Sequence, residues 1–187
     1  MDYLADIKNY EAQNPQEESD RRLILQYAEV YPNLLCRENE IAHITASGFI
    51  MNPALDQVLM VHHNIMNNWA WTGGHADGDG NLLGVALREA REETGVRDIR
   101  PLSPGIASID ILTVNGHFRR GLYVSAHLHL SVGYILICGQ NQRLHIKPDE
   151  NTGVRWLPLS YFTSEHFDAS DVYLYNKLIR RARTCAV

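Results

Sequence analysis

The sequence lacks several features that would place it in large classes of proteins. No apolar run approaches the roughly 20 residues needed to span a bilayer, so we expect no membrane partner. The three cysteines, Cys36, Cys138 and Cys185, are far apart and in no CxxC spacing, which indicates reduced thiols in a cytoplasmic protein. The first residues show no basic segment followed by an apolar run, so no secretory signal is expected.

An excess of basic charge is also missing. The chain has 17 Lys and Arg against 22 Asp and Glu, which gives a net charge of −5. A protein that binds nucleic-acid polymers usually carries a basic surface, so we expect no such partner. A small nucleotide is still an allowed ligand, because a bound metal ion can supply the positive charge.

The composition that is present suits one globular domain with an extension. Of the 187 residues, 45% are hydrophobic and 21% are charged, which is enough to bury a normal core. Asn14, Pro15 and Glu17 form a strong helix start near the N-terminus. We expect a helical extension over residues 1–38 that packs against a main domain of residues 39–187. Whether this arm covers the active site or forms the contact of a homodimer stays open.

Strand patterns follow in the middle of the chain. Apolar runs or alternating residues occur at 41–51, 58–61, 106–114 and 125–138. Asn115-Gly116 is a turn signal between the last two runs. Strands and helices are mixed without strict βαβ alternation, which favours a mixed sheet between helices.

A terminal helix is predicted for residues 171–183. Ser170 is the expected cap, and basic residues such as Lys177 and Arg181 favour the negative end of the helix. We expect this basic end to be solvated.

The most informative segment spans residues 73–96 and reads GGHADGDGNLLGVALREAREETGV. Its helix is predicted to begin at Asn81 and to end at Gly95. Glu89, Glu92 and Glu93 then share one face, where like charges repel one another unless a cation lies among them. The pattern favours a hard divalent metal, most plausibly Mg²⁺ with a phosphate-bearing substrate, over a solvated acidic surface helix.

This segment resembles the Nudix box of the MutT-like pyrophosphohydrolases, written G-x5-E-x7-R-E-U-x-E-E-x-G-U with U aliphatic. The matching residues are Gly74, Arg88, Glu89, Glu92, Glu93, Gly95 and Val96. The departure is Gly80, which stands where the family has its first glutamate, with Asp77 and Asp79 nearby as partial substitutes. The resemblance covers roughly residues 40 to 165 and implies an α/β fold class: a Nudix-type α/β/α sandwich with a mixed β-sheet and an N-terminal helical extension.

The resemblance also implies a set of site residues. The expected metal ligands are Gly73 or Gly74 through a backbone carbonyl, and Glu89, Glu92, Glu93 and Glu150. The expected catalytic residues are Glu89, Arg88 and Glu150. Here Glu89 is a third ligand or the base that takes a proton from water, and Arg88 pairs with it. Glu150, in a loop after the box, is a ligand, a general base or an ordinary acidic turn residue. The expected ion is Mg²⁺, with Mn²⁺ as an alternative.

Two histidines and two arginines are candidates for substrate contacts. His43 and His75 could line a cleft, because His75 directly follows the glycine pair. Arg119 and Arg120 lie in an expected loop where their cations could meet phosphate, although an exposed pair without a ligand is an equal alternative.

His127 and His129 share one face of an expected strand, and neutral imidazoles can bind zinc. No cysteine or third histidine lies at a recognisable spacing, so we expect a packed or solvent-facing role for both.

The function implied by the resemblance is Mg²⁺-dependent hydrolysis of the pyrophosphate bond in a nucleoside diphosphate linked to another group. Nucleoside triphosphates, nucleotide sugars, ADP-ribose and dinucleoside polyphosphates all fit, because the box does not distinguish them. Two alternatives stay open. One is a module that senses a nucleotide without turnover, which Gly80 favours. The other is an enzyme similar to isopentenyl diphosphate isomerase, although Cys36 and Cys138 lack the expected context.

Overall fold

The structure is a computed structural model that describes residues 2–119 and 121–185. Its helices are α1 (Tyr3–Asn9), α2 (Pro15–Val30), α3 (Leu82–Thr94), the short 3-10 helix η1 (Leu159–Tyr161) and α4 (Ala169–Cys185). Its strands are β1 (Ala42–Met51), β2 (Gln57–His63), β3 (Asn68–Ala70), β4 (Thr72–His75), β5 (Ile99–Pro101), β6 (Ser108–Val114), β7 (His117–Arg119), β8 (Leu122–Val124), β9 (His127–Cys138) and β10 (Asn151–Pro158). Within the described ranges, no helix is long and apolar enough to cross a membrane.

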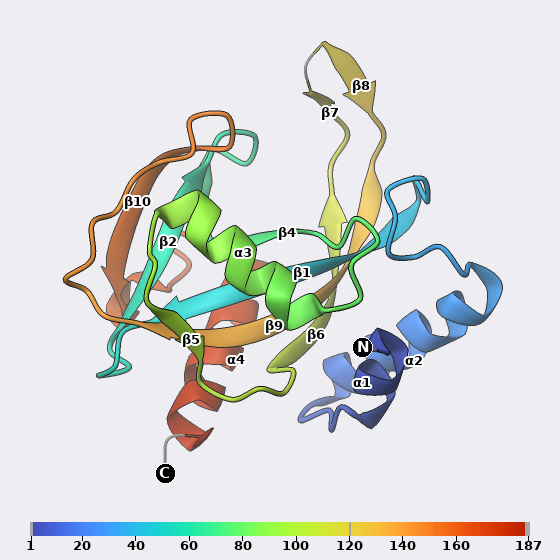
Figure 1. Ribbon diagram of the computed structural model, residues 1–187, viewed down its shortest axis with the longest axis horizontal. Coiled ribbons are helices and arrows are strands. Elements are labelled where there is room, and N and C mark those ends of the chain that lie inside the picture. The colour runs from blue at the N-terminus through green and yellow to red at the C-terminus, as the bar shows by residue number, and fades with distance from the viewer. Residues whose placement is uncertain (1, 120, 186–187) are drawn as a thin grey trace.

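Eight of the strands form one mixed, curled sheet. Its main path runs β10-β2-β1-β9-β5, while β3, β4 and β6 pair with β2, β1 and β9 respectively. Strands β1 and β9 are parallel over ten residue pairs, and the other strand pairs in the sheet are antiparallel. Helix α3 lies across one face of this sheet and α4 lies behind it (Figure 1). The expected α/β/α layering with a mixed sheet is therefore confirmed.

Strand β1 shows how the sequence builds two cores. Ile44 and Ala46 belong to the apolar cluster that contains the buried residues of α3. Phe49 and Met51 point to the opposite face, where they pack with Leu178 and other residues of α4. The alternation predicted for residues 41–51 is thus present, and both faces of the strand are buried because each is covered by helices.

The N-terminal helices precede the sheet and dock onto it through α2 and β6. The predicted start of α2 is confirmed, because the Asn14 side chain accepts a hydrogen bond from the Glu17 N–H. Glu17 is fully buried and forms a two-point pair with Arg181 at 3.0 Å, while Lys177 lies 3.1 Å from the same carboxylate. The expectation of a solvated basic end on α4 is therefore wrong for Lys177 and Arg181, because the arm covers them.

The predicted cap of α4 is also wrong. Asp168, rather than Ser170, caps this helix: its carboxylate accepts hydrogen bonds from the Asp171 N–H at 2.9 Å and from the Ser170 hydroxyl at 2.7 Å. A carboxylate accepts several bonds at once, which favours Asp168 over the hydroxyl beside it.

The turn predicted at Asn115-Gly116 is not where the chain reverses. The β6–β9 hairpin continues beyond it into the small β7–β8 ribbon, whose last described pair is Arg119 with Leu122. This ribbon projects from the body of the molecule (Figure 1). The expected loop at 118–120 is thus partly strand.

Candidate metal centre beside helix α3

Helix α3 is fixed at both ends by the residues that the sequence indicated. The Asn81 side chain accepts a hydrogen bond from the Gly84 N–H, and Gly95 ends the helix with φ of 81° in the left-handed region. Leu82, Val85 and Ala90 are buried against the sheet, so the helix can rotate little. These contacts direct Glu89 and Glu93 toward strand β4.

Three carboxylates converge at this position. Glu89, Glu93 and Glu150 each offer an oxygen atom, and these atoms lie within 4.8 Å of one another. The Asn151 side chain donates a hydrogen bond to the Glu93 carbonyl at 3.0 Å, which ties the loop of Glu150 to the end of α3. A residue far along the chain thereby completes the group, as the resemblance implied for Glu150.

The negative charges of the three carboxylates repel one another when no cation lies among them. Burial raises the pKa of Glu93 to about 8; the Gly73 N–H, which donates to its carboxylate at 2.9 Å, opposes this shift, and the charges of Glu150 and Glu89 add to it. Burial, followed by the charge of Glu92, raises the pKa of Glu89. Each oxygen is therefore better accommodated with a positive charge nearby.

Glu92 does not join this group. Its carboxylate is about half exposed and pairs with Lys147 at 3.2 Å. Lys147 also contacts Glu150 at 3.0 Å. Sequence reasoning missed this lysine, although its spacing of three residues before Glu150 was a usable signal.

The glycine pair brings the backbone of β4 against the carboxylates. A Cβ atom on Gly74 would lie 2.5 Å from the carboxyl carbon of Glu89, so a side chain there would displace the Glu89 carboxylate. Gly74 pairs with Ala46 in β1, which fixes its position in the sheet. A backbone carbonyl can approach an ion closely at such a glycine.

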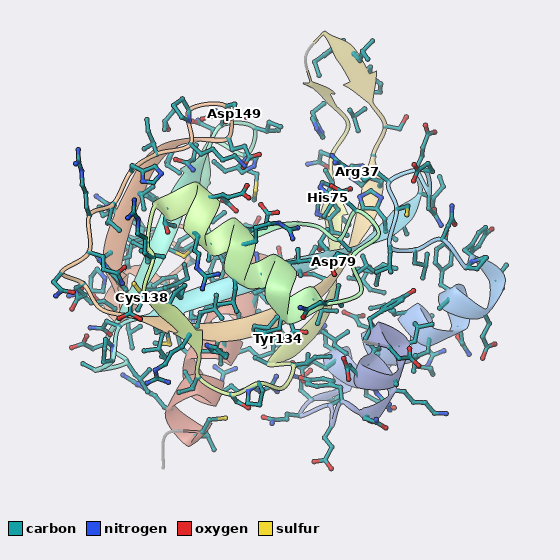
Figure 2. All side chains as sticks on the ribbon, in the orientation of Figure 1. Arg37, His75, Asp79, Tyr134, Cys138 and Asp149 are labelled. Carbon is teal, nitrogen blue, oxygen red and sulfur yellow. The ribbon has the colours of Figure 1, made fainter. Side chains whose placement is uncertain are left out.

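Arg88 is held by an aspartate. Its guanidinium lies 3.6 Å from Asp79 and 3.7 Å from Glu89. The Asn81 N–H donates to Asp79 at 2.8 Å, while Asp77 pairs with Arg37 at 2.6 Å. Figure 2 shows Asp79 in the loop before α3, with Arg37 near the start of β1. Of the two aspartates considered as substitutes at Gly80, only Asp79 contacts Arg88.

Of the residues considered for substrate contacts, His43 and His75 belong to a group separate from the three carboxylates. His43 is only 4% exposed, and its contact with a substrate stays a prediction. His75 is half-buried at the end of β4, next to Thr45 in the neighbouring strand. Arg120 and the side chain of Arg119 lie outside the described residues.

The residues present fit a hard divalent cation. Three carboxylates supply the oxygen donors that Mg²⁺ prefers, and the backbone of Gly74 lies against Glu89, where its carbonyl can contribute. Burial and the neighbouring carboxylates raise the pKa of Glu89 and of Glu93, and a bound cation would oppose both effects.

Comparison with known proteins agrees with the fold and with the acidic helix described above. The NUDIX domain family matches residues 42–177, and no curated protein gives a match. A hydrolase of the NUDIX family from Clostridium perfringens has a similar structure, with a TM-score of 0.54 and 18% identity over 74% of this chain and 96% of that chain. The MutT protein from Methanosarcina mazei Go1 gives a TM-score of 0.53 and 17% identity over 78% of this chain and 96% of that chain. These structural likenesses concern the fold alone, whereas the family match spans well over half of the sequence and includes the acidic helix: the chain belongs to the Nudix family.

Proposed function

We propose that this protein is a Mg²⁺-dependent hydrolase that cleaves the pyrophosphate bond of a nucleoside diphosphate linked to another group. The observation that carries the proposal is the convergence of Glu89, Glu93 and Glu150 beside the glycine pair in a chain of the Nudix family. The linked group is a phosphate, a sugar, a ribose or a second nucleotide. A cytoplasmic location fits the three free cysteines.

In this proposal the three carboxylates hold the cation together with a carbonyl of Gly73 or Gly74, and Mn²⁺ is the alternative ion. When bound, such an ion neutralises phosphate charge and lowers the pKa of water. Glu92, held by Lys147 at the rim of the group, is a fourth candidate ligand.

Proton transfer falls to a carboxylate of the same group. Glu89 accepts the proton from the attacking water, since burial already raises its pKa toward the range of a general base. Arg88 positions Glu89 through the contact at 3.7 Å. Glu150 serves as a further ligand or as the base in place of Glu89.

The test is product formation from a panel of nucleoside triphosphates, nucleotide sugars, ADP-ribose and dinucleoside polyphosphates, with and without Mg²⁺. Hydrolysis of at least one substrate is expected only with the ion. The Glu93→Gln variant should lower kcat by about 10²–10⁴-fold, in the range of a lost acid–base or ligand group. Glu165→Gln, the same change at an exposed residue outside the group, is the matched control. An active Glu93→Gln enzyme would contradict the proposal.

A nucleotide sensor without turnover is the second candidate. Gly80 favours it, and so does Lys147, which already supplies positive charge to Glu92 and Glu150. Tight binding of a nucleotide with no product from any member of the panel would select this function over hydrolysis.

A further inference from the structure

Four histidines from three adjacent strands meet on the sheet face opposite α3. His43 in β1 is the direct partner of His129 in β9, and His127 lies two residues before His129. His75 ends β4, where it is the cross-strand partner of Thr45. Cross-strand partners and residues two apart project to the same face, so the register alone gathers these side chains. Gly74, one residue before His75, faces the carboxylates on the other side of the sheet.

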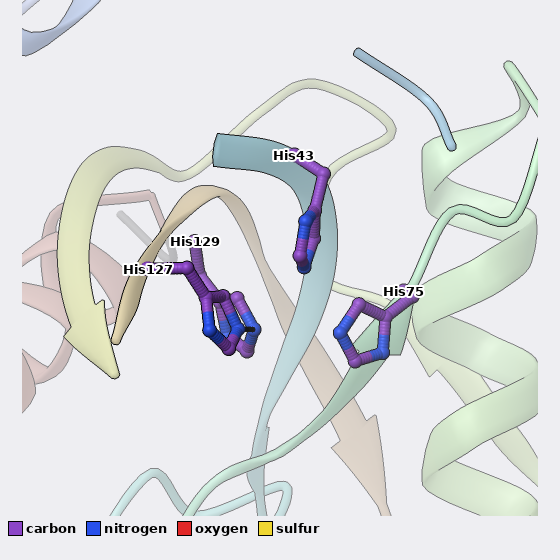
Figure 3. Close-up of side chains that lie close together, drawn as sticks. All are labelled: His43, His75, His127 and His129. Atoms are coloured by element: carbon purple, nitrogen blue, oxygen red, sulfur yellow. Dashed lines mark hydrogen bonds between the residues drawn. The ribbon is translucent and has the colours of Figure 1, made fainter. Parts of the chain in front are cut away.

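The four rings have the spacing of a ligand set. One nitrogen of each ring lies within 4.8 Å of one nitrogen of every other ring. The Nε2 atoms of His127 and His129 are 3.3 Å apart. Figure 3 shows the rings of His127 and His129 on one side of His43 and the ring of His75 on the other. A tetrahedral zinc ion with Zn–N bonds of about 2.0–2.1 Å needs ligand nitrogens about 3.3–3.4 Å apart, so small ring rotations are sufficient.

Backbone carbonyls orient two of the rings. The Nδ1 atom of His43 lies 3.0 Å from the Asn39 carbonyl, and the Nδ1 atom of His127 lies 2.9 Å from the Ser125 carbonyl. A carbonyl only accepts, so in each ring Nδ1 carries the proton and Nε2 carries the lone pair. This is the outer hydrogen bond that metal-binding histidines typically make.

The buried end of His43 lacks a partner. Its Nε2 atom is inaccessible to solvent and has no hydrogen bond within the described part of the chain. Buried polar atoms in proteins nearly always have a partner, and a bound cation satisfies a nitrogen lone pair as well as a hydrogen-bond donor does. Ring packing alone leaves this lone pair unsatisfied.

Two of the rings are poor proton acceptors. Burial lowers the pKa of His129 to about 3, and the neighbouring His75, His43 and His127 lower it further. Burial likewise lowers the pKa of His43. Neutral imidazoles are available as ligands without the loss of a proton.

We propose that a divalent transition metal ion such as Zn²⁺ is bound by four histidines: His43, His75, His127 and His129. Four imidazole nitrogens suit Zn²⁺, whereas Mg²⁺ prefers the oxygen donors of the carboxylate group on the opposite face. The ion joins the N-terminal ends of β1 and β9 to the C-terminal end of β4. The role is structural, and it does not depend on the proposed hydrolysis.

The test is a titration of the full-length, chelator-treated protein with Zn²⁺ in excess Mg²⁺, so that Mg²⁺ competes with Zn²⁺ for the carboxylates. We expect one equivalent of Zn²⁺ per chain in competition with a chromogenic chelator. His127→Gln should weaken binding at least about 100-fold, since even outer partners of a metal contribute about 10–100-fold. His166→Gln, at an exposed histidine stacked on Tyr161, and Glu150→Gln should leave the affinity unchanged.

X-ray absorption of the wild-type zinc complex gives a readout independent of variant folding. It should show nitrogen neighbours only, at about 2.0–2.1 Å. The proposal is overturned by less than one equivalent of bound Zn²⁺, by oxygen neighbours, or by loss of binding in Glu150→Gln with retention in a folded His127→Gln protein. Circular dichroism establishes the folding of each variant, and His75→Gln replaces His127→Gln if the latter does not fold.

Discussion

At the scale of single residues, Arg88 shows how a departure from the family pattern is accommodated. The Nudix box has a glutamate at the position of Gly80, and the arginine of the box normally has this acidic neighbour. Here Asp79 lies 3.6 Å from Arg88 and is itself fixed by the Asn81 N–H. The acidic neighbour of Arg88 is therefore at position 79 in this chain instead of at position 80.

Replacing Asp79 with Asn should slow hydrolysis by about 10-fold, because Arg88 would lose a partner that positions it against Glu89. Steady-state kinetics should show the loss in kcat with little change in KM. Adding Gly80→Glu to the Asp79→Asn protein should recover most of the rate. Equal rates for wild type and Asp79→Asn would show that this contact has no part in positioning Arg88.

The identity and spacing of residues predicted the carboxylate group but not the contacts of Lys147 or the histidine cluster. The spacing of Glu89 and Glu93 on one helix and the glycines before them were sufficient to locate the carboxylate group. Lys147 and the partnership of His43 with His129 depend on how segments far apart in sequence come together. Helical periodicity carries no information on the register between β1 and β9, so the four-histidine cluster was not predictable from spacing.

At the scale of elements, the C-terminal end of α3 depends on a residue without a side chain. Gly95 has φ of 81°, and a Cβ atom there would overlap the imidazole ring of His145. Gly95→Ala should therefore lower the free energy of unfolding by about 1–3 kcal/mol. Gly105→Ala, at a position with space and an ordinary φ, should change stability little. Urea denaturation of both variants measures the difference, and equal midpoints would contradict it.

The contact between α2 and α4 is an ion pair buried on both sides. Removing Arg181 takes two hydrogen bonds and one positive charge from the buried Glu17 carboxylate and leaves Lys177 as its neighbour, so Arg181→Met should destabilise the protein by about 3 kcal/mol. The double variant Glu17→Gln with Arg181→Met should recover part of this loss, because the carboxylate that lost its partner is then absent. A double-mutant cycle in denaturant measures the coupling. Additive losses would show that the two side chains do not interact.

The Glu17–Arg181 ion pair predicts how the free energy of unfolding depends on pH. Burial by itself would raise the pKa of Glu17, but hydrogen bonds from Arg181 and from the Gln13 N–H, with the charge of Lys177, lower it to about 2 from an ordinary value of 4.5. Since the folded state holds the carboxylate ionised, its contribution is complete above about pH 4.5 and is lost as the pH falls toward 2. Unfolding free energies at a series of pH values should decline in this window, and less so in Glu17→Gln.

At the scale of the whole molecule, the arm and the sheet share one interior. Ile7 and Ile24 of the N-terminal helices belong to the same apolar cluster as Leu82 and Ile44, and the buried ion pair joins α2 to α4 on the other layer. The layered architecture was implied by the resemblance to the Nudix box, and the strand and helix patterns alone only allowed it. The burial of Lys177 and Arg181 was not predictable, because a basic helix end has the same sequence pattern whether solvent or a distant carboxylate faces it.

This shared interior predicts a single unfolding transition. Tryptophan fluorescence reports on the sheet, since Trp69, Trp71 and Trp156 all lie in or beside its strands, while far-UV circular dichroism also reports on the helical arm. The two signals should change at the same urea concentration, as for a cooperative domain. An earlier transition in circular dichroism would show that the arm unfolds independently.

The peptide bond between Gly74 and His75 has a particular consequence. It joins Gly74, against which Glu89 lies, to His75 of the four-histidine group. Because a peptide unit is planar and rigid, we expect a shift of His75 to be transmitted to Gly74. Binding on one face of the sheet would then be coupled to the geometry of the carboxylates on the other face.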